Sequence, residues 1–466
     1  MDFKKLSRNL FFAFLFLLPF QTVLLLREPM IDGEKWQYGT IGVYFLDVIL
    51  VLAFSCFIFS KWKFARENQE SRIKNQAEKE GSLIPYSLFP ILFIGWSGLS
   101  ILWAQDAVLA GYFFVKLLLG AGVFFLVRSL DDADMKTAVK VLLAAAVLQS
   151  MLAVGQFLYQ SSPASTLLGM SAHESWQAGT SVLKLETGRF LRAYGSFPHP
   201  NMLGGFLAAV FVLGISYHVS RIRNRELWFS FIIRYSSFAI LLLGLILTFS
   251  RAAWLGTVMG IAMYFVFCIR YHVWGKQRAR ILGVLALALF MFVFVLRDQI
   301  FPRFDTTTIT REGSVSERVA SLADAKTLIA AHPIIGVGAG NFTKTVRGNE
   351  PGRPIWSIQP AHSVFVLIFA ELGVVGLVLF LVFLIALLKN VILGLDPGIQ
   401  EALWSLDSRR RGNDKQNSVT MRNRDVLFAI AFLAFLPSLF LDHWLWSSHF
   451  GLLFFFLLAG FVVRKS

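Results

Sequence analysis

The chain has 466 residues, of which 56% are hydrophobic and 16% are charged, and its mean hydropathy is +0.62. Ordinary soluble domains are less apolar and more highly charged. The composition therefore excludes a soluble domain and predicts a polytopic membrane protein. A net charge of +15 is also compatible with nucleic-acid binding, but the basic residues are dispersed among short segments between apolar runs. We therefore expect no nucleic-acid partner.

Twelve apolar runs have about the length that a helix needs to cross a bilayer. They lie near residues 10–26, 40–60, 84–103, 108–127, 137–159, 200–219, 227–248, 252–269, 281–296, 363–388, 426–441 and 448–463. The first run follows a basic start but lacks a small-residue cleavage site, so we expect a retained helix. The predicted fold class is an all-α polytopic membrane protein with about 12 transmembrane helices.

The distribution of Lys and Arg orients these helices. With the N-terminus inside, the inner segments carry 28 of the 44 basic residues and the outer segments carry 14. Since basic residues favour the cytoplasmic side, both termini are predicted to be cytoplasmic. Residues 1–296 are predicted to hold helices one to nine, with an outer loop at 160–198. Residues 297–361 form a long outer loop domain, and residues 362–466 hold the last three helices, with a cytoplasmic insert at 393–415.

The long outer loop contains one predicted helix. Between Ser314 and Ala331, the apolar positions recur at helical spacing, which predicts an amphipathic helix that stops at His332-Pro333. The glycine-rich segment from Gly336 to Phe342 is expected to be a flexible turn. No strand precedes its Gly-x-Gly, so we exclude a nucleotide-binding loop.

His362 stands where this polar loop meets the next apolar run. On a continuous helix of 100° per residue, Gly373 and Gly376 would lie within about 40° of it. Because glycines let a neighbouring helix approach closely, the stripe predicts a packed seam with a titratable group at its water-facing end. The alternative is an interfacial histidine followed by two packing glycines.

Several cations face the same outer side. Arg251 lies in a short turn between two apolar runs, where its guanidinium could reach lipid headgroups or bind a phosphate. Arg318 lies on the amphipathic helix, and Arg189 and Arg192 precede the helix that begins near residue 200. Asn201 is predicted to cap that helix. All four arginines are predicted to bind the substrate.

The outer segments contain no Asp-x-Asp and no paired carboxylates. A site for Mg²⁺ or Mn²⁺ is therefore not expected, and neither a metal nor a cofactor is predicted. Arginines would have to balance the charge of a diphosphate. A histidine whose pKa lies near the usual 6.5 could take the proton of an attacking hydroxyl.

These segments resemble the O-antigen ligase and polymerase superfamily. The similar stretches are Phe197-Pro-His-Pro-Asn-Met-Leu-Gly204, Ser250-Arg251-Ala-Ala-Trp-Leu-Gly256, the outer helix with Arg318 leading to His332 through Phe342, and His362-Ser363 followed by nine residues and Gly373-x-x-Gly376. The resemblance extends from about residue 192 to residue 379. The spacing from His-Ser to Gly-x-x-Gly is similar to that of the ligase branch in particular.

The resemblance implies a GT-C-like fold and a glycosyltransferase of lipopolysaccharide biosynthesis in the bacterial inner membrane. Such ligases move a glycan from undecaprenyl diphosphate to lipid A-core on the periplasmic face, without metal or nucleotide. By position, Arg251 and Arg318 would hold the diphosphate, and His362 would activate the acceptor hydroxyl or steady the pyrophosphate. Members also attach glycans to proteins or other lipids, which leaves the acceptor open.

Three other interpretations compete with the ligase. The polymerase pattern of Arg, ten residues and Gly is not met, because eleven residues separate Arg192 from Gly204. A transporter of the lipid-linked glycan would use charges within spans, for which Asp47, Lys116 and Arg234 are candidates, but no repeat relates the two halves. A purely structural membrane protein is the third.

The insert from Leu393 to Lys415 is polar, and it resembles the peptide encoded when a palindromic bacterial repeat is read in frame. Replacing it by a polar linker of about ten residues should be nearly neutral, because loop closure depends weakly on length. Complementation of a ligase-deficient strain by the deletion variant tests this. Failure despite normal membrane insertion would show that the insert has a function of its own.

Overall fold

The computed structural model describes residues 2–67, 88–185, 187–219, 228–270, 276–301, 313–395 and 415–463. The insert proposed at 393–415 lies mostly outside this described part. The α-helices are α1 (Phe3–Leu17), α2 (Phe45–Glu67), α4 (Leu88–Leu99), α5 (Ala107–Arg128), α6 (Asp132–Tyr159), α7 (Pro200–Val219), α8 (Trp228–Leu247), α9 (Arg251–Arg270), α10 (Lys276–Val295), α11 (Arg297–Ile300), α13 (Gly313–Ala331), α14 (Phe342–Asn349), α15 (Val364–Leu395), α17 (Lys415–Leu441), α18 (Trp444–Ser447) and α19 (His449–Val462).

Short strands form four antiparallel pairs in the loops. They are β1 (Val23–Arg27) with β4 (Ile41–Tyr44), β2 (Met30–Ile31) with β3 (Glu34–Lys35), β5 (Ser161–Ser162) with β6 (His173–Glu174), and β7 (Val182–Leu185) with β8 (Gly188–Leu191). Three 3₁₀ turns are also described, η1 (Gln37–Gly39), η3 (Ser100–Leu102) and η5 (Ile355–Ser357).

Each of the twelve predicted apolar runs overlaps a helix. Within the described ranges, four helices are long and apolar enough to cross a membrane: Phe45–Phe64, Ala107–Arg128, Asp132–Tyr159 and Val364–Lys389. Six shorter apolar helices accompany them. The all-α membrane class is therefore confirmed, whereas the number of spans and the GT-C-like arrangement stay predictions.

The first predicted helix, at residues 10–26, is wrong in its bounds. α1 begins at Phe3 and ends at Leu17, and the apolar residues that follow form β1. Pro19 explains the early stop, because proline has no backbone N–H to donate to the preceding turn, whereas Leu18 before it still has helical φ and ψ. The released strand pairs with β4 directly before α2, with Val23 opposite Tyr44.

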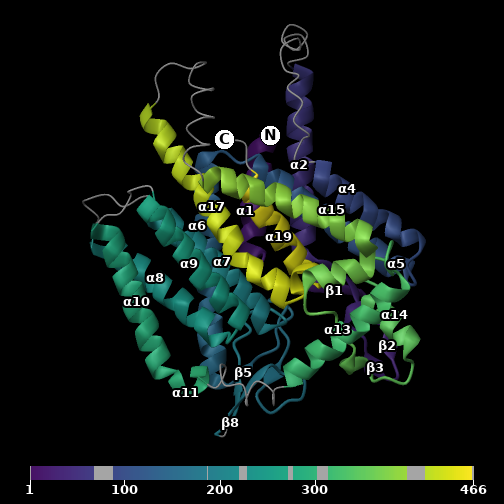
Figure 1. Cartoon of the computed structure of the whole chain (residues 1–466). Helices are drawn as coiled ribbons and strands as arrows, with labels where there is room; N and C mark the ends of the chain where they lie inside the picture. The colour runs from purple at the N-terminus through teal and green to yellow at the C-terminus, as the bar shows by residue number, and fades with distance from the viewer. Residues whose placement is uncertain are drawn as a thin grey trace.

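The helices pack around α19, which lies in the middle of the bundle, and around α17, which runs from the upper left edge toward the middle (Figure 1). α19 packs on α5, and α17 packs on α7 and α9. α1 packs on α2 and α6, while α15 packs on α4 and α17. α19 is buried from His449 to Phe461, as expected for a helix that is apolar on every side. Its phenylalanines contact those of neighbouring helices; for example, the ring of Phe454 meets that of Phe435 of α17 edge-on, with 5.3 Å between the centroids.

The bundle has two different ends (Figure 1). At the terminal end, α1 and α6 begin and α2, α5 and α19 end. At the loop end lie α13, α14 and the small sheets β2–β3 and β5–β6. The amphipathic helix predicted for Ser314–Ala331 is present as α13.

The glycine-rich segment after α13 is packed and hydrogen-bonded, contrary to the flexible turn that we predicted. The N–H groups of Val337 and Gly338 donate to the carbonyls of Ala370 and Glu371, at 3.1 and 2.8 Å. Gly340 N donates to Glu371 Oε2 at 2.8 Å. The segment is buried from Gly336 to Ala339, because α15 supplies acceptors for its backbone groups.

The prediction that His362, Gly373 and Gly376 share one face of a continuous helix is also wrong. α15 begins at Val364, after the histidine, and Gly373 interrupts the helix with φ 68° and ψ −172°. A Cβ at Gly373 would overlap the carbonyl group of Ile334. The loop backbone thus occupies the space of the missing side chain, and Pro333 O accepts from Val374 N at 2.9 Å.

The predicted cap of α7 is displaced as well. α7 begins at Pro200, so Asn201 lies within its first turn. Proline is favoured at this first position because its missing N–H needs no helical partner. His199 serves as the cap: its Nδ1 accepts from Asn201 N at 3.1 Å, and its carbonyl accepts from Met202 N at 3.0 Å.

Gly373→Ala should destabilise the protein by about 1–3 kcal/mol, because a side chain is strained at positive φ and would displace the loop backbone. Gly155→Ala is the matched control, since a Cβ there meets no atom within 4 Å. Thermal unfolding of both variants in detergent measures the difference. Equal melting temperatures would show that the kink tolerates a side chain.

Candidate functional site

A chain of polar contacts joins α7 to the segment between α17 and α18. Asn201 Nδ2 donates to Asp442 Oδ2 at 2.6 Å, and Asn201 Oδ1 accepts from Arg192 Nη2 at 2.7 Å. Asp442 also accepts from His443 N at 2.8 Å through Oδ1. Both Arg192 and Asp442 are buried. The amide of Asn201 therefore links a buried guanidinium to a buried carboxylate.

Three histidines surround this carboxylate. The rings of His362 and His443 lie 5.0 Å apart between centroids, nearly perpendicular at 86°. His199 lies 3.0 Å from Ser181 Oγ through Nε2. Because His199 Nδ1 accepts from a backbone N–H, the proton of its neutral ring is on Nε2, where it donates to Ser181.

Burial keeps these imidazoles neutral at physiological pH. It lowers the pKa of His362 to about 4, with repulsion by His443 and Arg318 acting in the same direction and attraction by Asp442 opposing it. Burial also lowers the pKa of His443, against the attraction of Asp442. The pKa of Asp442 is raised by burial, but interaction with the histidines outweighs this and lowers it overall. The site thus combines neutral imidazoles with an ionised carboxylate.

α13 brings Arg318 to the same cluster. The Arg318 side chain is half-buried, and its Nε is buried without a hydrogen-bond partner in the described part of the chain. One turn further along α13, Ser321 Oγ lies 3.5 Å from Nδ1 of His362. Since buried donors are nearly always paired, Arg318 presents an unused N–H group beside the histidines, which suits an anion.

Arg251 is the first residue of α9. The turn before it includes Phe249 at a φ of 48°, and the carbonyl of Thr248 accepts from Arg192 Nε at 2.8 Å. Ser250 Oγ accepts from Ala253 N at 3.5 Å. The structure therefore brings the turn that carries Arg251 into contact with Arg192, and through it with the Asn201–Asp442 pair.

The other predicted residues lie elsewhere. Arg189, on β8, is exposed and donates to the carbonyls of Ser175 and Gln177, at 2.8 and 3.2 Å. Its guanidinium stabilises the loop before β7, and direct contact with a substrate stays a prediction. Gly373 and Gly376 lie at and after the kink of α15, so they shape the helix rather than the surroundings of the histidine.

The predicted site did not include Glu371, although this residue connects several parts of the site. Its Oε2 accepts from Trp446 Nε1 at 2.8 Å and from Gly340 N at 2.8 Å. Trp446 lies in α18, three residues after His443. The buried glutamate therefore holds α18 against α15 and the glycine-rich turn, which positions His443 relative to His362.

Asp442, His443 and Tyr38 were also missed. Tyr38 OH donates to Gln359 Oε1 at 2.6 Å, and its ring meets that of His443 edge-on at 6.3 Å. A signal for Asp442-His443 was available, because both lie in the short outer turn predicted between the last two apolar runs. No such signal existed for Tyr38, whose place depends on the path of the first loop.

An O-antigen ligase family model matches residues 236–381. This match confirms the predicted resemblance to the O-antigen ligase and polymerase superfamily over residues 236–381. The matched segment contains Arg251, Arg318 and His362, and it leaves out Asn201 and Asp442. No curated protein matches the chain.

His362→Gln should flatten the pH dependence of stability. The folded-state pKa of about 4 lies below the roughly 6.5 of a free imidazole, so the unfolded chain binds more protons between these values. Histidine-dependent stability is therefore complete above about pH 6.5 and is lost as the pH falls toward 4, by up to about 3 kcal/mol. Melting curves from neutral pH to about pH 4.5 compare the variant with wild type.

Exposed His332 provides the control for this experiment. His332→Gln should follow the wild-type curve. Parallel curves for wild type and His362→Gln would contradict a depressed pKa at His362.

Proposed function

We propose that this protein is an O-antigen ligase that transfers a glycan from undecaprenyl diphosphate to lipid A-core. The reaction would take place on the periplasmic face of the bacterial inner membrane, with both termini in the cytoplasm. The observation that carries the proposal is the juxtaposition of neutral His362 and His443, buried Asp442 and the unpaired Arg318 Nε at the loop end. The match to the O-antigen ligase family supports the same class of reaction.

In the proposed step, an acceptor hydroxyl oxygen attacks the anomeric carbon of the donor glycan. A new glycosidic C–O bond forms as the bond from that carbon to the diphosphate oxygen breaks. His362 takes the hydroxyl proton, which its neutral ring allows. The product imidazolium is stabilised by Asp442, because that carboxylate already favours the charged form of the ring. Undecaprenyl diphosphate leaves with the electron pair of the broken bond.

Arginines would balance the charge that develops on the leaving diphosphate. Within the described residues, Arg318 has an Nε–H group without a partner beside the histidines. Arg251 begins α9, directly after the turn in which the Thr248 carbonyl accepts from Arg192. A guanidinium binds phosphate oxygens through two parallel hydrogen bonds. Arg192 is already bonded to Asn201 and Thr248, so we assign it to positioning Asp442. This arrangement needs no metal ion, and metal independence is part of the proposal.

The alternatives differ in acceptor or in class. A polymerase would use a second lipid-linked glycan in place of lipid A-core, and other members of the superfamily use proteins or other lipids. A transporter would depend on charges within the spans. Of its candidates, Asp47 pairs with His449 at 2.8 Å, and the side chain of Arg234 lies outside the described part. The gathering of histidines and arginines at the loop end favours the transferase.

The test is transfer by the purified protein in vitro. The donor is undecaprenyl-diphosphate glycan, the acceptor is lipid A-core, and the readout is the gel mobility of the acceptor. Transfer to lipid A-core, retained in excess EDTA, supports the proposal. Extension of the donor glycan alone indicates a polymerase, and loss of transfer in EDTA with recovery in Mg²⁺ contradicts metal independence. No transfer to any acceptor, with donor moved across vesicles, indicates a transporter.

His362→Ala should lower transfer at least about a hundredfold, the usual effect of removing a general base. Expression and melting temperature near pH 7.5 should stay close to wild type, because the residue precedes α15 and water can replace its contacts. His332→Ala, outside the cluster, should transfer normally. A wild-type rate for His362→Ala would remove this residue from the mechanism.

Arg318→Lys and Arg251→Lys should each weaken donor binding about tenfold or more, because an ammonium cannot make the paired contacts of a guanidinium. Arg297→Lys is the matched control, since Arg297 is exposed and pairs with its neighbour Asp298 at 3.5 Å. Donor affinity measured by titration separates the variants. Normal donor affinity in both lysine variants would indicate that these arginines contact lipid headgroups and not the donor diphosphate.

A further inference from the structure

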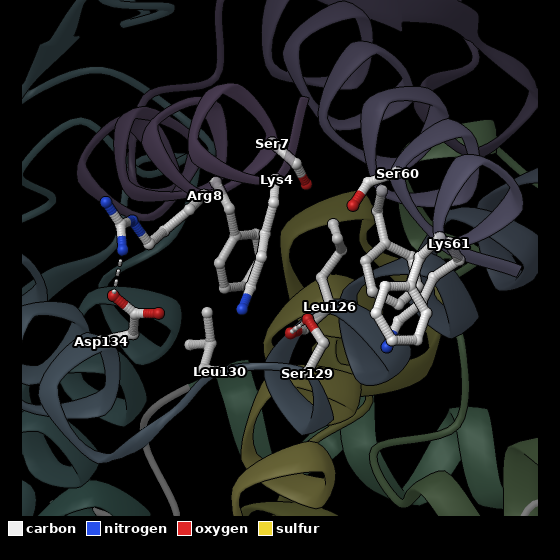
Figure 2. A pocket seen from close by; sticks show the side chains of 12 residues that line it. Lys4, Ser7, Arg8, Ser60, Lys61, Leu126, Ser129, Leu130 and Asp134 are labelled. Atoms are coloured by element: carbon white, nitrogen blue, oxygen red, sulfur yellow. Dashed lines mark hydrogen bonds and ion pairs between the residues drawn. The ribbon is translucent and has the colours of Figure 1, made fainter. Parts of the chain in front are cut away.

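A cavity of about 280 Å³ lies at the terminal end, remote from the histidine cluster. It is formed where α1 begins, α2 ends and the chain passes from α5 to α6 (Figure 2). Six of its lining residues have cationic or hydroxyl side chains: Lys4, Ser7, Arg8, Ser60, Lys61 and Ser129. Asp134 is the single carboxylate among the lining residues. The pocket is therefore positively charged.

The three cations of the pocket differ in whether they pair with a carboxylate. Arg8 Nη1 pairs with Asp134 Oδ1 at 3.3 Å. Lys61 Nζ lies 5.7 Å from the centre of the Phe57 ring. No ion pair joins Lys4 or Lys61 to a carboxylate in the part of the chain that the structure describes. Figure 2 shows Lys4 pointing into the middle of the pocket, with the Arg8–Asp134 pair on one side and Lys61 on the other.

The three hydroxyl groups of the pocket differ in whether they already donate a hydrogen bond. Ser7 Oγ donates to Ala53 O at 2.8 Å, and Ser129 Oγ donates to Leu126 O at 2.7 Å. Ser60 Oγ has no hydrogen bond within the described ranges, so its proton remains available. Two ammonium groups and one free hydroxyl suit the oxygens of a phosphodiester, which accept hydrogen bonds and carry negative charge.

The rest of the lining is apolar and continues onto the outer face of α2. Phe57 and Phe64 line the pocket, and Phe64 is 61% exposed. Along the same helix, Leu52 and Ile58 are also exposed, as expected where a spanning helix meets hydrocarbon rather than protein. A ligand with a charged head and hydrocarbon chains would match both parts of the surface.

We propose that this pocket binds the phosphodiester headgroup of an anionic glycerophospholipid, with the acyl chains lying along α2. Such a lipid is distinct from the glycan donor, because the two sites lie at opposite ends of α1. The 15 residues of α1 span about 22 Å. Just beyond the helix, the Pro19 carbonyl accepts from Oγ of Ser196 at 2.8 Å, and Ser196 lies in the segment between Arg192 and Asn201. The bound lipid joins α1, α2 and α6 at the membrane surface.

Binding of a fluorescent phosphatidylglycerol to the full-length protein in detergent tests this proposal. We expect phosphatidylglycerol to bind at least tenfold more tightly than phosphatidylcholine. The double variant Lys4→Gln/Lys61→Gln should lower the phosphatidylglycerol affinity about tenfold. The control Lys5→Gln/Lys63→Gln removes the same charge from the same two helices outside the pocket lining, and it should change affinity less than twofold.

A second variant, Ser60→Leu, occupies the pocket without changing its charge and should also weaken phosphatidylglycerol binding. Melting temperatures without lipid identify any variant that fails to fold. Equal loss in the pocket and control double variants, or equal binding of phosphatidylcholine, would overturn the proposal in favour of general surface attraction. Displacement of the lipid by millimolar inorganic phosphate, with tight phosphate binding on its own, would overturn the lipid assignment in favour of a soluble phosphate.

Discussion

The loop end of the bundle depends on how the buried carboxylate of Asp442 is satisfied. A buried ionised group is costly unless it is paired and hydrogen-bonded. Asn201 donates a hydrogen bond to Asp442 and accepts one from Arg192. Arg192 also donates to the carbonyl of Thr248, at the start of the α8–α9 turn. Three segments that are distant in the sequence, around residues 192–201, 248 and 442, are therefore connected by hydrogen bonds. The same carboxylate provides the negative charge around which the histidines are arranged.

The kink of α15 makes a second connection, between the long loop and the bundle. Because Gly373 has no side chain, the backbone at Pro333 and Ile334 can reach the helix axis and accept from Val374 N. Glu371, two residues earlier, binds the glycine-rich turn and Trp446. These contacts hold α13 over the start of α15, which places Arg318 beside the histidines. The kink thus controls the site from a distance through packing.

The two ends of the bundle carry different chemistry. At the loop end, buried Arg192 and buried Asp442 are joined through Asn201 beside neutral histidines, which suits a reaction that needs a defined geometry and neutral bases. At the terminal end, the lysines are exposed and lie next to apolar surface, which suits attraction to lipid phosphates. α1 spans the distance between them, from the pocket at Lys4 to the contact between Pro19 and Ser196. A lipid held at one end can therefore stabilise the frame that supports the other.

The amino-acid sequence alone determined the membrane class, the positions of most helices and the helix α13, because hydropathy and helical periodicity are properties of neighbouring residues. Its motifs also showed the resemblance to the O-antigen ligase family, which the family model matches over residues 236–381. It also identified His362, Arg251, Arg318 and Arg192 as candidates for the site. Only the tertiary structure decided that α1 ends before Pro19, that Gly373 breaks α15 and that Asn201 bonds to Asp442 rather than capping α7. Residues 201 and 442 meet because α7 packs against α17, and no local pattern of the sequence encodes that distance.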